Sequence, residues 1–233
     1  MQNKVREFAA DRWAWIREQF DDLDSLRQRL DYQTYLLAAA GLIASLLLGI
    51  ADLATKGSIE LRQQEDMLAT LEQVLPAELF DNELLNDTVQ ITDNAERGLG
   101  ETQVYLARKD GKVTAVAFKL SAPGGYSGPI TLVMGIDAAG VILGTRVIAH
   151  AETPGLGDKI EKAKSDWILA FSGRSLDNTA LDRWKVKKDG GDFDQFAGAT
   201  ITPRAVVGGV HAGLSFFQRH RAELLSTNPE ATP

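Results

Sequence analysis

The stretch VYLARKDGKVTAVAFKL, residues 104–120, is typical of a β-hairpin. Its two apolar runs flank Asp110-Gly111, and glycine readily adopts the positive φ that a tight hairpin turn requires. Two further apolar runs follow at 130–136 and 141–148, with a glycine-rich loop over 122–129 before them. Because the connections are short, we expect an antiparallel meander of four strands.

Two helices are predicted after these strands. The first covers residues 158–171, with Asp158 as its cap and Gly173 at its end. The second begins with Thr202 as cap and Pro203 in its first turn. The apolar faces consist of Ile160, Ala163, Trp167 and Phe171 in the first helix, and of Val206, Val210, Leu214, Phe217 and Leu224 in the second. An antiparallel sheet with packed helices makes the fold class α+β.

An apolar run near the N-terminus predicts a transmembrane helix over residues 32–51. No charged residue lies between Asp31 and Asp52, and about 20 apolar residues cross about 30 Å of hydrocarbon. A buried core helix and a signal peptide are the alternatives, but a polar segment precedes this run, which disfavours a signal peptide. Basic residues are Lys4, Arg6, Arg12, Arg17, Arg27 and Arg29 before the run, and Lys56 and Arg62 soon after it. This excess predicts a single-pass protein with a cytoplasmic N-terminus and its main domain across the membrane. If the source is a Gram-negative bacterium, the membrane is the bacterial inner membrane and the main domain is periplasmic.

Four other segments complete the expected organisation. Residues 1–31 are predicted to form a cytoplasmic amphipathic helix, which is suited to a membrane surface, to a partner protein or to plain solvation. Residues 52–77 are assigned to a linker helix, in which a second helical stretch opens at Gly57-Ser58 and runs to Leu75, where Pro76 stops it. The main domain is assigned to 78–226, followed by a tail over 227–233.

Composition excludes several kinds of chemistry. A net charge of −7 argues against a nucleic-acid partner, which would require a basic surface. The absence of cysteine excludes disulfides, cysteine-bound iron–sulfur clusters and a thiol nucleophile, and three scattered histidines give little support to a metal site. We therefore assign no catalytic and no metal-binding residue, and expect any redox chemistry to come from an organic cofactor.

Two loops have the composition of a ligand site. One is HAETPGLG at 150–157, and the other is DQFAGATITP at 194–203. Small residues allow close approach to the backbone, and the start of the following helix favours an anion, to which Arg204 adds a positive charge. On composition alone, loops of this kind are more often ordinary turns than ligand sites.

The segment Asp194-Gln-Phe-Ala-Gly-Ala-Thr200 resembles the flavinylation motif of the FMN-binding domain family. In that family a flavin transferase joins a threonine or serine hydroxyl to the phosphate of FMN through a phosphoester. The resemblance places Thr200 at the accepting position, with Asp194, Gly198 and Ala199 as recognition residues. Ala197 departs from the pattern, since the family usually has serine or threonine there.

The segment from His150 to Lys159 resembles the family segment that lines the flavin ring, which implies ring contacts by Glu152, Thr153 and Leu156. With the anchor, the two motifs make residues 35–224 similar to the G subunits of Rnf electron-transport complexes. The resemblance implies an electron carrier with covalent FMN among other membrane subunits, in a complex that couples NADH and ferredoxin redox chemistry to ion translocation. The C subunit of the sodium-pumping NADH:quinone reductase is the competing assignment.

Two functions of other classes remain open. A membrane-anchored binding or assembly module without cofactor would purify as a colourless protein. An anchored hydrolase would use Thr200 or a serine as nucleophile and His150 as base. No histidine and carboxylate stand at a recognisable spacing from a nucleophile, so the sequence gives the hydrolase little support.

Overall fold

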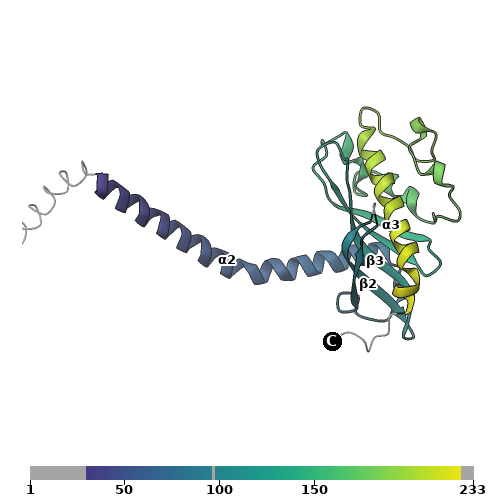
Figure 1. Ribbon diagram of the computed structural model, residues 1–233, viewed down its shortest axis with the longest axis horizontal. Coiled ribbons are helices and arrows are strands. Elements are labelled where there is room, and N and C mark those ends of the chain that lie inside the picture. Colours follow the sequence, from purple (N-terminus) through teal and green to yellow (C-terminus); the bar gives the residue numbers. More distant parts are fainter. Residues whose placement is uncertain (1–29, 96–97, 227–233) are drawn as a thin grey trace, which may run out of the picture. The chain divides into compact units, whose positions relative to one another are not determined.

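The computed structural model describes residues 30–95 and 98–226, and the chain divides into two units between Arg62 and Gln63. The predicted helix at 1–31 and the tail at 227–233 therefore lie almost wholly outside the described residues. The first described element is α2, which runs from Leu30 to Val74 (Figure 1). It continues through Gly57, where a second helix was expected to begin, because one glycine inside a helix costs only about 1 kcal/mol.

The N-terminal part of α2 has the properties of a membrane span. Its large apolar side chains between Tyr35 and Leu53 are exposed. Within the described part of the chain, α2 is the one helix long and apolar enough to cross a membrane. The apolar helix predicted at 32–51 is confirmed.

A five-stranded antiparallel sheet forms the centre of the second unit, with its strands in the order β1-β2-β3-β4-β5. The strands are β1 (Thr88–Asp93), β2 (Gly100–Lys109), β3 (Lys112–Ala122), β4 (Ile130–Asp137) and β5 (Ile142–Ala149). The predicted meander is confirmed, and β1 is added to its edge. The turn between β2 and β3 has positive φ at both Asp110 (53°) and Gly111 (75°), as a two-residue hairpin turn requires.

The helix α3 (Ile201–Ser226) covers one face of this sheet (Figure 1). Two glycines let α3 approach the strands closely. A Cβ added to Gly209 would lie 2.5 Å from Ala122 Cβ, and one added to Gly213 would lie 2.4 Å from Met134 Cε. The larger hydrophobic core forms between α3 and the sheet, and it includes Phe118, Phe216 and Phe217.

The end of α2 covers the opposite face. Leu71, Val74 and Leu75 pack there against the small side chains of Ala107, Ala115 and Ala117. Gly135 in β4 is needed for this contact, since its Cβ would lie 2.3 Å from the carbonyl oxygen of Val74. Both faces of β3 are therefore buried, which explains its long apolar run.

The continuous helix predicted over 158–171 is wrong. The segment forms two short 3-10 helices, η2 (Gly157–Ile160) and η3 (Asp166–Phe171). Ser165, rather than Asp158, caps η3, by accepting the Trp167 N–H at 3.1 Å. A helical period would have faced Ala163 inward, whereas the interrupted chain leaves Ala163 exposed and buries Ile168. Core packing has overridden the local helical pattern. Three further short 3-10 helices are η1 (Ala77–Leu79), η4 (Leu181–Arg183) and η5 (Lys187–Asp189).

Candidate functional site

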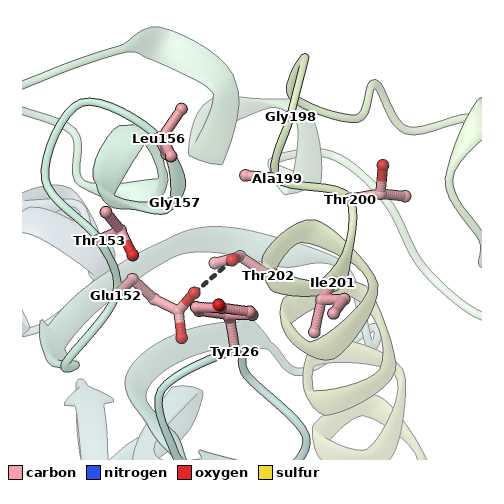
Figure 2. Close-up of a pocket in the computed structure, with 10 residues that line it drawn as sticks. All are labelled: Tyr126, Glu152, Thr153, Leu156, Gly157, Gly198, Ala199, Thr200, Ile201 and Thr202. Carbon is pink, nitrogen blue, oxygen red and sulfur yellow. Dashed lines mark hydrogen bonds between the residues drawn. The ribbon is translucent and has the colours of Figure 1, made fainter.

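Three loops from separate parts of the sequence surround a cavity of about 350 Å³ (Figure 2). They are the glycine-rich loop between β3 and β4, the loop after β5, and the loop before α3. The lining residues are Tyr126, Glu152, Thr153, Leu156, Gly157, Gly198, Ala199, Thr200, Ile201 and Thr202. The volume falls in the range of about 300–1,000 Å³ that is usual for small-molecule sites.

Six of the eight residues named from the sequence meet at this cavity: Glu152, Thr153, Leu156, Gly198, Ala199 and Thr200. The two predicted loops are therefore one site. Asp194 and Arg204 do not line the cavity. The Asp194 carboxylate pairs with Lys187 Nζ at 2.6 Å. The Arg204 guanidinium pairs with Asp189 at 2.5 and 2.8 Å, and this ion pair lowers the pKa of Asp189.

Thr200 directly precedes α3, so it occupies the cap position that the sequence assigned to Thr202. A capping hydroxyl normally accepts a bond from the second or third N–H of its helix, and the third residue here is Pro203, which has none. Among the described residues, no hydrogen-bond partner is found for the Thr200 hydroxyl. Figure 2 shows its side chain pointing away from Glu152 and Thr153. The hydroxyl is half-buried and free to react.

A tight turn presents Ala199 and Thr200 at the cavity. The Ala199 N–H donates to the Phe196 carbonyl at 3.1 Å, and Gly198 between them has a φ of 80°. A residue with a side chain would be strained at that φ, so the turn requires this glycine. Trp167 fixes the start of this loop at Asp194. Its Nε1–H donates to the Asp194 carbonyl at 2.7 Å, and the centroids of its ring and the Phe196 ring are 5.2 Å apart.

Glu152 is a buried acid that ties the three loops together. Its side chain is 5% exposed and accepts hydrogen bonds from the Thr202 hydroxyl and, at 3.1 Å, from the Ser127 N–H. A Cβ added to either Gly125 or Gly157 would lie 2.8 Å from its carboxylate oxygens. These two glycines allow the acid to fit between the loops.

His150 contacts the backbone of Glu152 and links it to a cluster of three charged residues, Asp158, Glu161 and Lys164. The His150 Nδ1 accepts the Glu152 N–H at 3.0 Å, and its Nε2 lies 2.9 Å from a carboxylate oxygen of Glu161. The Lys164 ammonium bonds to Asp158 and Glu161, and it lowers the pKa of both acids. Because both His150 nitrogens are engaged and neither contacts Thr200, the described geometry gives no support to a hydrolase with His150 as base.

Tyr126, Gly157, Ile201 and Thr202 line the cavity but were missed from the sequence. The one available signal was an aromatic residue inside a glycine-rich loop, which marks Tyr126. Thr202 was assigned as a cap, whereas it is buried in the first turn of α3 and bonded to Glu152. Among the described residues there is no cluster of three or more acidic or histidine side chains that could hold a metal ion.

Comparisons with known proteins agree with this geometry. A family model described as an FMN-binding domain matches residues 125–215, which include every lining residue of the cavity. A protein of Cereibacter sphaeroides is 53% identical over 83% of this chain and 87% of its own length. Relatives from Stutzerimonas stutzeri and Vibrio vulnificus are 47% and 41% identical, over 91% and 88% of this chain and 90% and 95% of their own lengths. Each of the three is described as the G subunit of an ion-translocating oxidoreductase complex.

Proposed function

Because this chain belongs to the family of G subunits of ion-translocating oxidoreductase complexes and contains an FMN-binding domain, we propose that it carries electrons on FMN bound covalently to Thr200. The bond would be a phosphoester between the Thr200 hydroxyl oxygen and the phosphate of FMN, made by a flavin transferase. Relatives of 41–53% identity that are G subunits favour this assignment over the C subunit of the sodium-pumping NADH:quinone reductase.

The observation that carries the proposal is the position of the Thr200 hydroxyl. It stands at the edge of the cavity, half-buried, and makes no hydrogen bond with the described residues. Pro203 cannot donate to it, and among the described residues no bond to it from the Thr202 N–H is found, so this oxygen does not act as a helix cap. An ester at this oxygen would therefore remove no stabilising contact of the folded chain.

The start of α3 would stabilise the phosphate. The N–H groups of the first helical turn lack partners within the helix, and the positive end of the helix dipole favours an anion. Ile201 and Thr202 contribute such N–H groups beside the cavity. Arg204 is committed to Asp189 and lies outside the cavity, so we assign it to holding the helix start rather than to direct contact with the phosphate.

The ring site would be formed by Glu152, Thr153 and Leu156. FMN supplies one- and two-electron redox states when it is bound. The residues of this chain bind and orient the ring: Leu156 offers an apolar surface, and the buried Glu152 carboxylate holds the surrounding loops in place. Asp194 keeps its proposed role in transferase recognition, because its side chain is exposed and its backbone is fixed by Trp167.

We further propose that residues 32–51 of α2 span a bacterial inner membrane, with the N-terminus in the cytoplasm and the FMN-binding domain in the periplasm. The excess of basic residues before the span supports this orientation. The partners would be the other subunits of the complex, which would couple NADH and ferredoxin redox chemistry to ion translocation.

The test is a denaturing gel of the full chain, co-expressed with a flavin transferase and viewed under ultraviolet light. We expect a fluorescent band for wild type and for Thr200→Ser, and a dark band for Thr200→Val. Thr92→Val is the control, since it removes an exposed threonine hydroxyl from β1, outside the cavity, and its band should stay fluorescent. A dark wild-type band, together with the bare polypeptide mass, would support a cofactor-free module instead.

A further inference from the structure

The glycine-rich loop between β3 and β4 brings an aromatic side chain to the cavity. Tyr126 lines the cavity, yet 69% of the residue is exposed. On either side of it, Gly124 and Gly128 have φ values of 85° and 133°, which residues with side chains rarely adopt. The backbone conformation at these two glycines determines the path of the loop and therefore the position of Tyr126.

The residues beside Tyr126 are fixed to the buried acid of the site. The Ser127 N–H donates to Glu152, and a Cβ added to Gly125 would lie 2.8 Å from the same carboxylate and 2.4 Å from the Gly128 carbonyl oxygen. Both neighbours of Tyr126, Gly125 and Ser127, therefore lie against the Glu152 carboxylate, while the phenol ring of Tyr126 projects from the loop. Among the described residues, no hydrogen-bond partner of the Tyr126 hydroxyl is found.

Two other exposed apolar side chains border the same cavity. Leu156 is 43% exposed and Ile201 is 45% exposed. Figure 2 shows Leu156 and Tyr126 on opposite sides of the space between the loops, with Ile201 beside Tyr126. Exposed apolar side chains that border one cavity from two loops and the start of α3 are suited to a flat aromatic ligand, which would remove them from water.

We propose that Tyr126 stacks against the isoalloxazine ring of the FMN on Thr200, so that its phenol ring forms one wall of the flavin site opposite Leu156. The inference rests on the proposed function. Aromatic rings prefer offset or edge-to-face contact, and a side chain projecting from an anchored loop can adjust to either. The stacked phenol would shield one face of the flavin from solvent.

Flavin fluorescence tests this contact without measuring activity. A stacked phenol reduces the photoexcited flavin by one electron and regains that electron in the dark, so emission is quenched and nothing is consumed. Phenylalanine can stack but cannot donate the electron, and leucine can do neither. The experiment uses the full flavinylated chain in detergent, as wild type, Tyr126→Phe and Tyr126→Leu, with flavin stoichiometry fixed by intact mass. Tyr105→Phe is the matched control, because Tyr105 packs against the cluster on the other face of the sheet.

We expect emission per flavin to rise several-fold in both Tyr126 variants and to stay unchanged in Tyr105→Phe. Quenching by added iodide should become stronger in Tyr126→Leu but not in Tyr126→Phe, since only leucine uncovers the ring. After unfolding in guanidinium, all four proteins should emit equally. A flavinylated wild type whose emission and iodide quenching match those of Tyr126→Leu would overturn the Tyr126 assignment alone. A wild type without covalent flavin would contradict the proposed function as well.

Discussion

The hydroxyl of Thr202 donates a hydrogen bond to the carboxylate of Glu152, across 50 residues of sequence. Both side chains are buried, at the point where the first turn of α3 meets the loop after β5. Through this bond the two sequence motifs of the site become one structure. The link also gives the acid a defined orientation, because its other oxygen accepts the Ser127 N–H.

Replacement of Thr202 by valine should destabilise the domain. The change keeps the shape of the side chain but leaves a buried carboxylate oxygen without its donor, which costs about 1–3 kcal/mol. The free energy of unfolding from urea titration measures the loss. Thr145→Val is the matched control, since the buried Thr145 hydroxyl has no hydrogen-bond partner in the part of the chain that the structure describes, and its removal should be neutral or stabilising. Equal losses in the two variants would show that the Glu152 bond contributes nothing.

Replacement of Trp167 by phenylalanine should slow covalent flavin incorporation while the chain stays folded. The variant keeps a ring against Phe196 but loses the indole donor to the Asp194 carbonyl, a bond that contributes about 0.5–1.5 kcal/mol. The measurement is the initial rate of flavin attachment by a purified transferase. Trp184→Phe serves as control, because its indole donates to the Thr179 carbonyl, outside the acceptor loop. An unchanged rate in Trp167→Phe would mean that the loop holds its shape without the indole.

Arg219 should make the domain more stable at neutral than at acid pH. The pKa of the buried Asp93 is lowered from 3.8 to about 2, most strongly by the hydrogen bond from Arg219 and further by the Ala95 and Leu99 N–H groups. A lowered folded-state pKa stabilises the fold above the unfolded value, and this contribution, about 2 kcal/mol, is lost as the pH falls from about 4 to 2. Arg219→Met should lower the free energy of unfolding at pH 7 and flatten its decline between pH 4 and 2.

The control for that experiment is Arg221→Met on the same helix, since no ion pair of Arg221 with a described residue is found. Its profile of unfolding free energy against pH should follow wild type. If Arg219→Met also followed wild type below pH 4, the stabilisation would have to come from other groups beside Asp93. These are the Ala95 and Leu99 N–H groups, which donate to its carboxylate, and His220, whose Nε2 lies 3.6 Å from an Asp93 oxygen.

Two glycine substitutions should have opposite effects on stability. In Gly135→Ala the new methyl group would meet the Val74 carbonyl oxygen, so the end of α2 must move, at a cost of about 1–3 kcal/mol. In Gly208→Ala the methyl group meets nothing within 4 Å on an exposed helical position, and the domain should gain about 0.5–1 kcal/mol. The measurement is the urea concentration at the midpoint of unfolding, which should be lower than wild type for Gly135→Ala and higher for Gly208→Ala. Destabilisation by Gly208→Ala would contradict the open surroundings that the structure gives this position.

The sequence predicted those parts of the fold whose signals are local. The hairpin at Asp110-Gly111, four of the strands and the last helix follow from turn chemistry and from apolar periodicity. The strand β1 was missed because it offers only Val89 and Ile91 as apolar residues and acquires its strand character by pairing with β2. The region 158–171 was misassigned because its conformation is decided by the core it packs against.

The candidate site divides in the same way. Its two motifs could be read from the sequence because each is a continuous run of residues. The contribution of Tyr126 and the bond from Thr202 to Glu152 could not, since both depend on how distant loops meet. The pairing of Arg204 with Asp189 was hidden for the same reason, and it removes a charge that the sequence had placed beside the ligand.

The burial of the last turns of α2 has a practical consequence for working with this domain in water. A soluble fragment cut at residue 78, where the sequence places the domain boundary, would lack Leu71, Val74 and Leu75, which are almost fully buried. The face of the sheet that carries Ala107, Ala115 and Ala117 would then be exposed to solvent, and we expect such fragments to aggregate or to express poorly. A fragment that starts at Gln63 would keep the last turns of α2 and would still omit the apolar segment at 32–51.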